Sequence, residues 1–198
     1  MTDSTANHLS VWYPSAAVVA KANVTRLVAK LGCENYAQLH KLSIEKPDAY
    51  WAHLMDFLHI RWSRPYDVYC DLSLGKPFPR WFVGGELNWI DTIFGWADQN
   101  GDRPAVIAER EDGGVSQLTY RDLESRVKSF AAGLREEGIR RGDRVGLLIE
   151  NGIEAVVSFL GISCLGAIAV PLFSGFGRDA VVSRLSLCGA VGLIARTC

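Results

Sequence analysis

The sequence predicts an α/β fold whose second half is a parallel βαβαβ sheet, preceded by a mostly helical N-terminal region. Apolar stretches of strand length at 143–151, 168–172 and 191–195 are separated by stretches with helical periodicity at 153–165 and 179–188. Such alternation predicts parallel strands joined by right-handed crossovers. The two halves also differ in composition, since all six tryptophans precede residue 100 and the later part is rich in Gly, Val, Ala and Leu.

Composition and charge exclude several classes of protein. The 198 residues, of which 48% are hydrophobic and 22% charged, have ordinary globular composition and can bury a core. A formal net charge of −1 gives no general attraction to nucleic acid or to an anionic membrane, and we interpret the cluster Arg140, Arg141 and Arg144 as a solvated turn. The five cysteines include no Cys-x-x-Cys pair, which favours reduced thiols in a cytoplasmic protein. The start of the chain, MTDSTANHLS, lacks the apolar core of a signal peptide and is expected to be a disordered tail.

One stretch has the length of a membrane span, because residues 155–177 contain no charged side chain. Gly161, Gly166 and Pro171 interrupt it. A helix over 153–165 would also rise only about 20 Å, short of a hydrocarbon core of about 30 Å. We therefore expect a buried helix followed by a strand, and no membrane partner.

The first half is predicted to contain helices around an irregular segment. Apolar residues at i, i+3, i+4 and i+7 over 24–31 predict an amphipathic helix that Gly32 ends. A second helix is expected over 48–59 and a third over 88–98. The Pro- and Gly-spaced passage between them, 64–88, has room for short strands at most and should wrap a larger body.

The second half is predicted to begin with a hairpin and a capped helix. Strands over 105–109 and 115–118 should turn at Asp112-Gly113-Gly114. Thr119-x-x-Asp122 is similar to a capping box, and apolar residues then keep helical spacing as far as Gly138.

Two kinds of catalytic site are not supported by the residues. The four histidines, His8, His40, His53 and His59, form no His-Glu-x-x-His pattern, so no metal site is assigned. The segment from Gly161 through Ser163 to Gly166 is one residue longer than the Gly-x-Ser-x-Gly nucleophile elbow and falls inside a predicted helix. We assign no catalytic residue.

The segment VPLFSGFGRDA carries the spacing Gly175-x-Gly177-x-x-Ala180 of a dinucleotide-binding turn. Arg196, at the end of the next strand, would suit the 2′-phosphate of NADP. However, Pro171 is awkward in a central strand, and Asp179 would repel a phosphate at the start of the next helix. From the residues alone, an anion-tolerant loop and a purely structural strand-to-helix turn both remain open.

The order of the motifs resembles the N-terminal portion of the AMP-forming acyl-CoA synthetases, and within them the acetyl-CoA synthetase-like branch. PRWFVGGELNW, residues 79–89, is similar to the branch's W-F-x-G-G-x-L-N signature. The run from Leu118 to Gly177 resembles the superfamily's opening segment, and residues 22–69 are more loosely similar to the branch's N-terminal extension. The resemblance implies an N-terminal extension over 1–90 and, over 91–198, the first part of a large AMP-binding domain.

The family resemblance implies a two-step reaction with ATP and CoA as substrates, Mg²⁺ accompanying ATP, and a small carboxylic acid as the third substrate. The reaction needs a Ser/Thr/Gly-rich phosphate loop with a Lys, and no such run occurs before Cys198. We therefore expect a truncated protein that is inactive alone. In the branch, the loop F-G-G-F lies beside the CoA nucleotide, and Phe173, Ser174 and Gly175 occupy its first positions here. An NADP-dependent oxidoreductase and a non-catalytic remnant are the alternatives.

Overall fold

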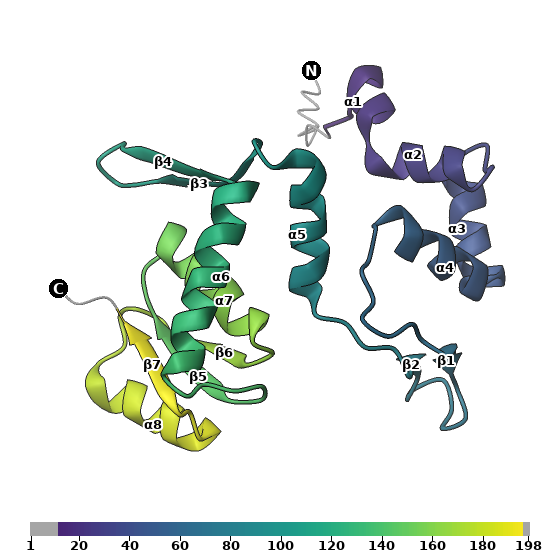
Figure 1. Ribbon diagram of the computed structural model, residues 1–198. Coiled ribbons are helices and arrows are strands. Elements are labelled where there is room, and N and C mark those ends of the chain that lie inside the picture. The colour runs from purple at the N-terminus through teal and green to yellow at the C-terminus, as the bar shows by residue number, and fades with distance from the viewer. Residues whose placement is uncertain (1–11, 196–198) are drawn as a thin grey trace, which may run out of the picture. The chain divides into compact units, whose positions relative to one another are not determined.

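The computed structural model describes residues 12–195, and their contacts divide the chain into two compact units. Among the described residues, one unit comprises 12–58 and 68–83, and the other comprises 59–67 and 84–195. Figure 1 labels the helices and strands of both units. The domain boundary between residues 90 and 91 was drawn from the resemblance and stays a prediction.

The first unit combines short helices with one small hairpin. Gly32, with φ 66°, follows the predicted amphipathic helix and prevents its continuation. The helix expected over 48–59 ends two residues earlier, because His59 adopts φ 53°, which a right-handed helix cannot contain. The elements are α1 (Ala16–Lys21), α2 (Asn23–Lys30), α3 (Tyr36–Glu45), α4 (Pro47–Phe57) and the antiparallel pair β1 (Val68–Asp71) and β2 (Arg80–Val83).

Aromatic side chains join α4 to the hairpin of this unit. Trp51 of α4 lies 6.0 Å from Trp81 and 6.1 Å from Phe82 between ring centroids, and Tyr69 of β1 contacts both of those rings edge-on. Leu27 and Leu39 are the buried apolar side chains among the described residues of this unit. The expectation of short strands in the irregular passage is therefore confirmed, and aromatic contacts supply much of their packing.

The second unit contains the regular α/β part of the chain. Its elements are α5 (Trp89–Asn100), β3 (Pro104–Glu109), β4 (Val115–Thr119), α6 (Tyr120–Glu136), β5 (Arg144–Leu148), α7 (Ile153–Cys164), β6 (Ile168–Pro171), α8 (Arg178–Cys188) and β7 (Gly192–Ala195). The predicted hairpin is confirmed as the antiparallel pair β3 and β4. The predicted cap is also confirmed, since Oγ1 of Thr119 accepts a hydrogen bond of 3.1 Å from the Asp122 N–H at the start of α6.

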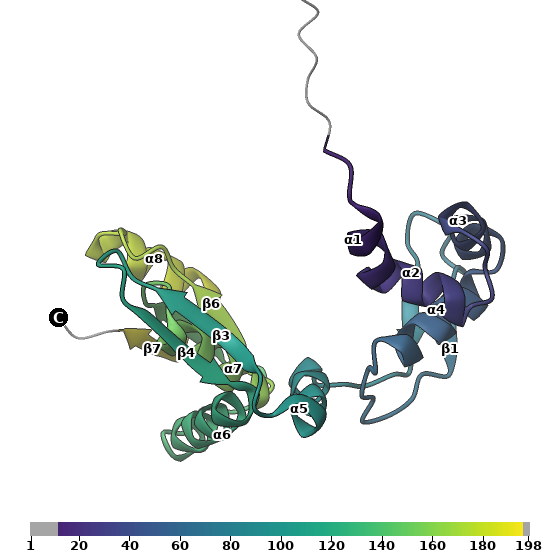
Figure 2. The same ribbon diagram turned by 90° about the horizontal axis from the view of Figure 1, so that it is seen from above.

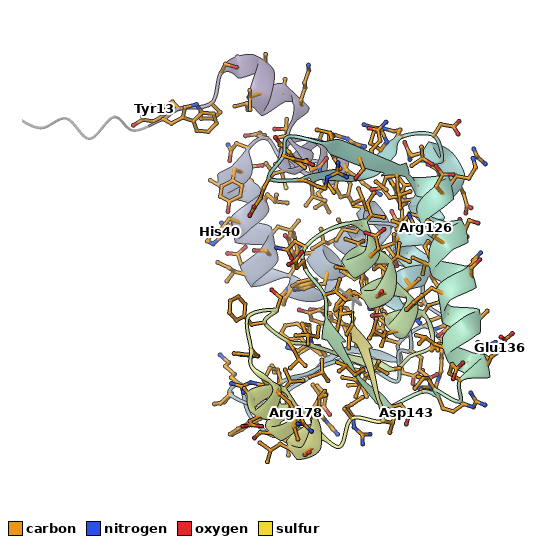
Figure 3. The ribbon with its side chains drawn as sticks, turned by 90° about the vertical axis from the view of Figure 1, so that its left-hand side faces the viewer. Tyr13, His40, Arg126, Glu136, Asp143 and Arg178 are labelled. Carbon is orange, nitrogen blue, oxygen red and sulfur yellow. The ribbon has the colours of Figure 1, made fainter. Side chains whose placement is uncertain are left out.

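Three helices enclose the main core of this unit. Its buried side chains come from α5, α6 and α7, and Val127, at the centre of α6, is 0% exposed. Arg126 of α6 also forms an ion pair of 3.6 Å with Glu154 of α7, and Figure 3 shows Arg126 and Glu136 at two levels of α6. The core residues are Ile90, Phe94, Leu123, Val127, Ile153, Val157 and Leu160.

The sheet of the second unit has the order β6-β5-β7, with both pairs parallel, which confirms the predicted βαβαβ arrangement. Val145 of β5 packs with Ile162 of α7 in a second core cluster. The next residue, Gly146, faces Leu185 of α8, whose Cδ2 lies 2.5 Å from the place that an added Cβ would take. Because successive strand residues point to opposite faces, α7 and α8 cover opposite sides of the sheet, and Figure 2 shows α8 and α6 on opposite sides of the strands.

Several sequence expectations are tested by these elements. Pro171 ends β6, an edge strand of the three described strands, where its missing N–H breaks no ladder bond between two neighbours. The four described cysteines are free thiols, and Cys198 lies outside the described residues. Among residues 12–195, no helix is both long and apolar enough to cross a membrane.

Two members of the arginine cluster make specific hydrogen bonds, while Arg140 and Arg141 are exposed, as expected for a solvated turn, and Arg144 is half-buried. Arg144 donates from Nε to the Cys188 oxygen at 3.0 Å and from Nη2 to the Gly189 oxygen at 2.8 Å, at the end of α8. Arg140 donates from Nη1 to the oxygens of Arg135 and Ile139, at the end of α6. Arg144 thus bonds to carbonyls at the C-terminus of α8. The Arg135 oxygen also accepts from the Gly138 N–H, at 3.1 Å.

Candidate functional site

The predicted site residues lie in the loop between β6 and α8. This loop follows the carboxyl end of a parallel strand, which is the edge where ligands bind in open α/β sheets. The Leu172 N–H bonds to the Leu147 oxygen at 2.9 Å, so the backbone is anchored to β5 up to the start of the loop. Phe173, Ser174 and Gly175 follow directly and are all exposed.

The loop is a compact turn with an aromatic pair. The Phe176 N–H donates to the Phe173 oxygen at 3.0 Å, which closes the turn. The rings of Phe173 and Phe176 meet edge to face, with centroids 5.5 Å apart and planes at 83°. Phe173 is 68% exposed, so this loop presents an apolar aromatic residue to its surroundings.

A cation lies on the other ring of this pair. The guanidinium carbon of Arg184, on α8, is 4.1 Å from the centroid of Phe176, within the range of a cation–π interaction. Its Nη1 also donates to the Ala180 oxygen of the preceding turn at 3.0 Å. Arg178, labelled in Figure 3, is the first residue of α8 and adds a second positive charge, against the single negative charge of Asp179.

The two glycines of this loop have different roles. Gly177 precedes α8 with φ −67° and open space around its missing side chain, so neither backbone angle nor crowding requires glycine there. An added Cβ on Gly175 would lie 2.6 Å from Cε1 of the Phe173 ring. Gly175 therefore leaves room for the Phe173 ring to fold over the backbone. Neither glycine adopts the positive φ that favours glycine over other residues. Arg196, the proposed NADP contact, lies outside the described residues.

The W-F-x-G-G-x-L-N segment has a structural role in the second unit from its first glycine onward. Gly84 adopts φ 81°, and a Cβ there would collide with the Asp67 carboxylate. Asn88 accepts a hydrogen bond from the Ile90 N–H at 3.2 Å and so caps α5, while its Nδ2 donates to the Ser163 oxygen at 2.9 Å. The segment thus fixes the start of α5 against the end of α7.

A cleft lies beside Asn88 at the amino ends of the strands. It has a volume of about 440 Å³ and is lined by residues of the 86–89 and 163–167 segments together with Ser63 and Arg141. Cys164 lines it, and burial raises the pKa of this thiol, with a smaller contribution from the charge of Asp91. The raised pKa disfavours the thiolate that a nucleophile needs. Ser163 lies inside α7 and donates to the Phe159 oxygen at 2.9 Å, so neither side chain is an activated nucleophile. Residues 12–195 contain no group of three or more His, Cys, Asp or Glu side chains placed to hold a metal ion.

Comparison with protein-family models assigns the chain. The model described as AMP-binding enzyme matches residues 93–198, and the model described as acetyl-coenzyme A synthetase N-terminus matches residues 36–91. The chain belongs to the AMP-binding enzyme family. This membership confirms the resemblance drawn from the sequence, and it favours that family over an NADP-dependent oxidoreductase.

Individual relatives agree with this assignment to the AMP-binding enzyme family. The chain is 34% identical over 194 residues to an acetyl-coenzyme A synthetase of Ralstonia nicotianae, covering 97% of this chain and 28% of that protein. It is 39% identical over 150 residues to an acetyl-coenzyme A synthetase of Cupriavidus necator, covering 74% of this chain and 22% of that one. The solved structure of acetoacetyl-CoA synthetase from Streptomyces lividans matches with a TM-score of 0.82 at 30% identity, over 92% of this chain and 29% of its own. The chain thus spans less than a third of the length of these relatives.

Two contacts around the candidate site of this chain were not predicted from the sequence. The contact between Arg184 and Phe176 joins residues eight positions apart across a loop and a helix, a separation that no periodicity marks. The bond from Asn88 to Ser163 joins residues 75 positions apart, a separation that no local sequence pattern marks.

Proposed function

We propose that this chain is the N-terminal part of an AMP-forming acyl-CoA synthetase. The match of two family models in the order of the acetyl-CoA synthetases carries the proposal. In the proposed reaction a carboxylate oxygen attacks the α-phosphorus of ATP, and the bond to pyrophosphate breaks, which gives an acyl-adenylate. The thiol of CoA then attacks the acyl carbon, loses its proton, and displaces AMP.

In this reaction the chain contributes a sheet and one edge of the CoA site. Phe173, Ser174 and Gly175 would contact the CoA nucleotide, and the exposed ring of Phe173 offers an apolar face to it. Ser174 replaces the first glycine of the family's loop, which puts a hydroxymethyl group where the backbone alone would face the ligand. Gly175 keeps the space over which the Phe173 ring folds.

The matched substitutions Gly175→Ala and Gly177→Ala test this assignment of the loop. The first places a Cβ 2.6 Å from the Phe173 ring and displaces it, whereas the second meets open space. We expect the product of the complete open reading frame to bind CoA more weakly after Gly175→Ala and unchanged after Gly177→Ala, measured by isothermal titration calorimetry. Equal CoA affinity in both variants would contradict the assignment of Phe173 and Gly175 to the CoA site.

The proposed chemistry requires parts beyond those that residues 1–198 supply. No Ser/Thr/Gly-rich phosphate loop with a Lys occurs in them, and Mg²⁺ would arrive with the phosphates of ATP. We expect no acid-dependent exchange of pyrophosphate into ATP by residues 1–198 alone, and exchange by the product of the complete open reading frame. Exchange catalysed by residues 1–198 would contradict this part of the proposal.

The sequence of the complete open reading frame decides between a synthetase and a non-catalytic remnant. A complete open reading frame that encodes the phosphate loop supports the synthetase, whereas one that ends at Cys198 favours the remnant. A small carboxylic acid is the proposed third substrate, since the relatives are named acetyl- and acetoacetyl-CoA synthetases. Exchange assays with acetate, propionate and acetoacetate would identify it. A cytoplasmic location stays a prediction.

A further inference from the structure

The surroundings of Phe176 contain a cation with unused hydrogen-bond donors. The guanidinium of Arg184 lies over the ring at 4.1 Å, and one of its nitrogens donates to the Ala180 oxygen. A guanidinium carries five N–H groups in one plane, so stacking on its face leaves donors at its edge. Among residues 12–195, no carboxylate forms an ion pair with Arg184 or with Arg178.

The position of this cation is set by the loop that carries the candidate site. Phe176 is held by the turn bond to Phe173 and by the edge-to-face contact of the two rings. Arg184 is held on the other side of Phe176 by its bond to Ala180. The cation is therefore fixed one ring away from the exposed surface of Phe173, and an arginine oriented in this way loses less entropy when it binds an anion.

We propose that Arg184 binds a phosphate group of the CoA nucleotide, with its guanidinium face held on Phe176 and its edge directed to the phosphate oxygens. The assignment rests on the proposed function of the loop. Phosphate fits because it accepts several hydrogen bonds from a planar guanidinium and because the local charge is positive. A neutral pantetheine arm offers Arg184 no comparable partner.

The test compares CoA with pantetheine, an acceptor that has the thiol arm and no phosphate. The product of the complete open reading frame and its variants Arg184→Met, Arg184→Lys and Arg178→Met are assayed for acid-dependent release of AMP. We expect Arg184→Met to raise the KM for CoA by about tenfold, the effect of losing a charge-assisted hydrogen bond. The kcat and the KM values for ATP and pantetheine should not change.

The other variants separate a specific contact from general electrostatics. Arg184→Lys keeps the charge and loses the planar fork, so its KM for CoA should be intermediate. Arg178→Met removes the same charge from the same helix without a ring beneath it, and its KM for CoA should change by less than about twofold because exposed charges are screened. Added salt should raise the KM for CoA of the unaltered protein more than that of Arg184→Met.

Three outcomes would overturn the assignment. Parallel increases of KM for CoA and pantetheine in Arg184→Met would show that the residue only maintains the loop. Equal effects of Arg178→Met and Arg184→Met would show diffuse attraction. Failure of the unaltered protein to use or bind CoA would refute the proposed function itself, and this assignment with it.

Discussion

The Nδ2 group of Asn88 donates to the main-chain oxygens of Ser163 and Cys164, at 2.9 and 3.2 Å, while its Oδ1 accepts from the Ile90 N–H. One amide therefore caps the start of α5 and satisfies two carbonyls at the end of α7. Because these helices share the main core, the side chain connects two segments that the chain itself separates by 75 residues.

Asn88→Asp should destabilise the second unit although aspartate is a good helix cap. The substitution keeps the acceptor for the Ile90 N–H, removes both N–H donors, and brings a negative charge to the carbonyl end of α7. We expect a loss of about 1–3 kcal/mol in the free energy of unfolding, measured by urea denaturation. Asn35→Asp is the control, since Asn35 accepts from the Gln38 N–H and caps α3. Equal stability of the two variants would contradict the role assigned to Asn88.

Gly161→Ala should be destabilising where Gly133→Ala is stabilising. A Cβ on Gly161 would lie 2.6 Å from Cδ1 of the Phe130 ring, at the contact of α7 with α6, whereas Gly133 has open space around it. We expect Gly161→Ala to lower the free energy of unfolding by about 1–3 kcal/mol because the added methyl group overpacks the contact. Gly133→Ala should add up to about 1 kcal/mol through helix propensity. Thermal unfolding followed by circular dichroism measures both, and a stabilised Gly161→Ala variant would show that the helices can separate without cost.

Arg144→Met should loosen the end of α8. Arg144 donates to the carbonyls of Cys188 and Gly189 at the end of α8, where a helix has no N–H groups of its own left to bond them. Methionine keeps much of the apolar stem of arginine and removes its donors. We therefore expect the free energy of unfolding to fall by about 1–2 kcal/mol because the hydrogen bonds are lost. Arg110→Met, which removes an exposed ion pair with Asp112, should change stability by less than about 1 kcal/mol. Amide hydrogen exchange in α8 is the direct measurement, and unchanged protection there in Arg144→Met would refute the prediction.

Stability should fall at high pH because of Cys164. Burial raises the pKa of its thiol in the folded protein, so the folded state holds its proton more firmly than the unfolded state does. This contribution is fully present below the unfolded thiol pKa of about 8.5 and is lost as the pH rises from there through the folded value.

Urea denaturation of the unaltered protein and of Cys164→Ala between pH 7 and pH 10 measures this effect. The decline attributable to the thiol should be absent in Cys164→Ala. A folded-state alkylation rate for Cys164 that rises at lower pH than in the unfolded chain would also contradict the prediction.

The sequence indicated most of the second unit because its local signals agree with one another. Thr119 caps α6, Gly138 follows its end, and apolar periods of helix and strand alternate to β7. In the first unit α1 and α3 escaped detection, since α1 has only six residues and no buried one, and α3 buries only Leu39. Such helices carry too weak an apolar period for the pattern to predict them.

For the candidate site, the sequence by itself determined which loop to consider, because the glycine spacing and the family motif are local features of residues 173–177. Only the tertiary structure decided what surrounds it: the Arg184 cation on Phe176, the Phe173 ring over Gly175, and the placement of Pro171 on an edge strand. The reason is physical. Local sequence fixes backbone preference and the order of elements, whereas contacts between distant side chains depend on which faces of strands and helices meet when the core is packed.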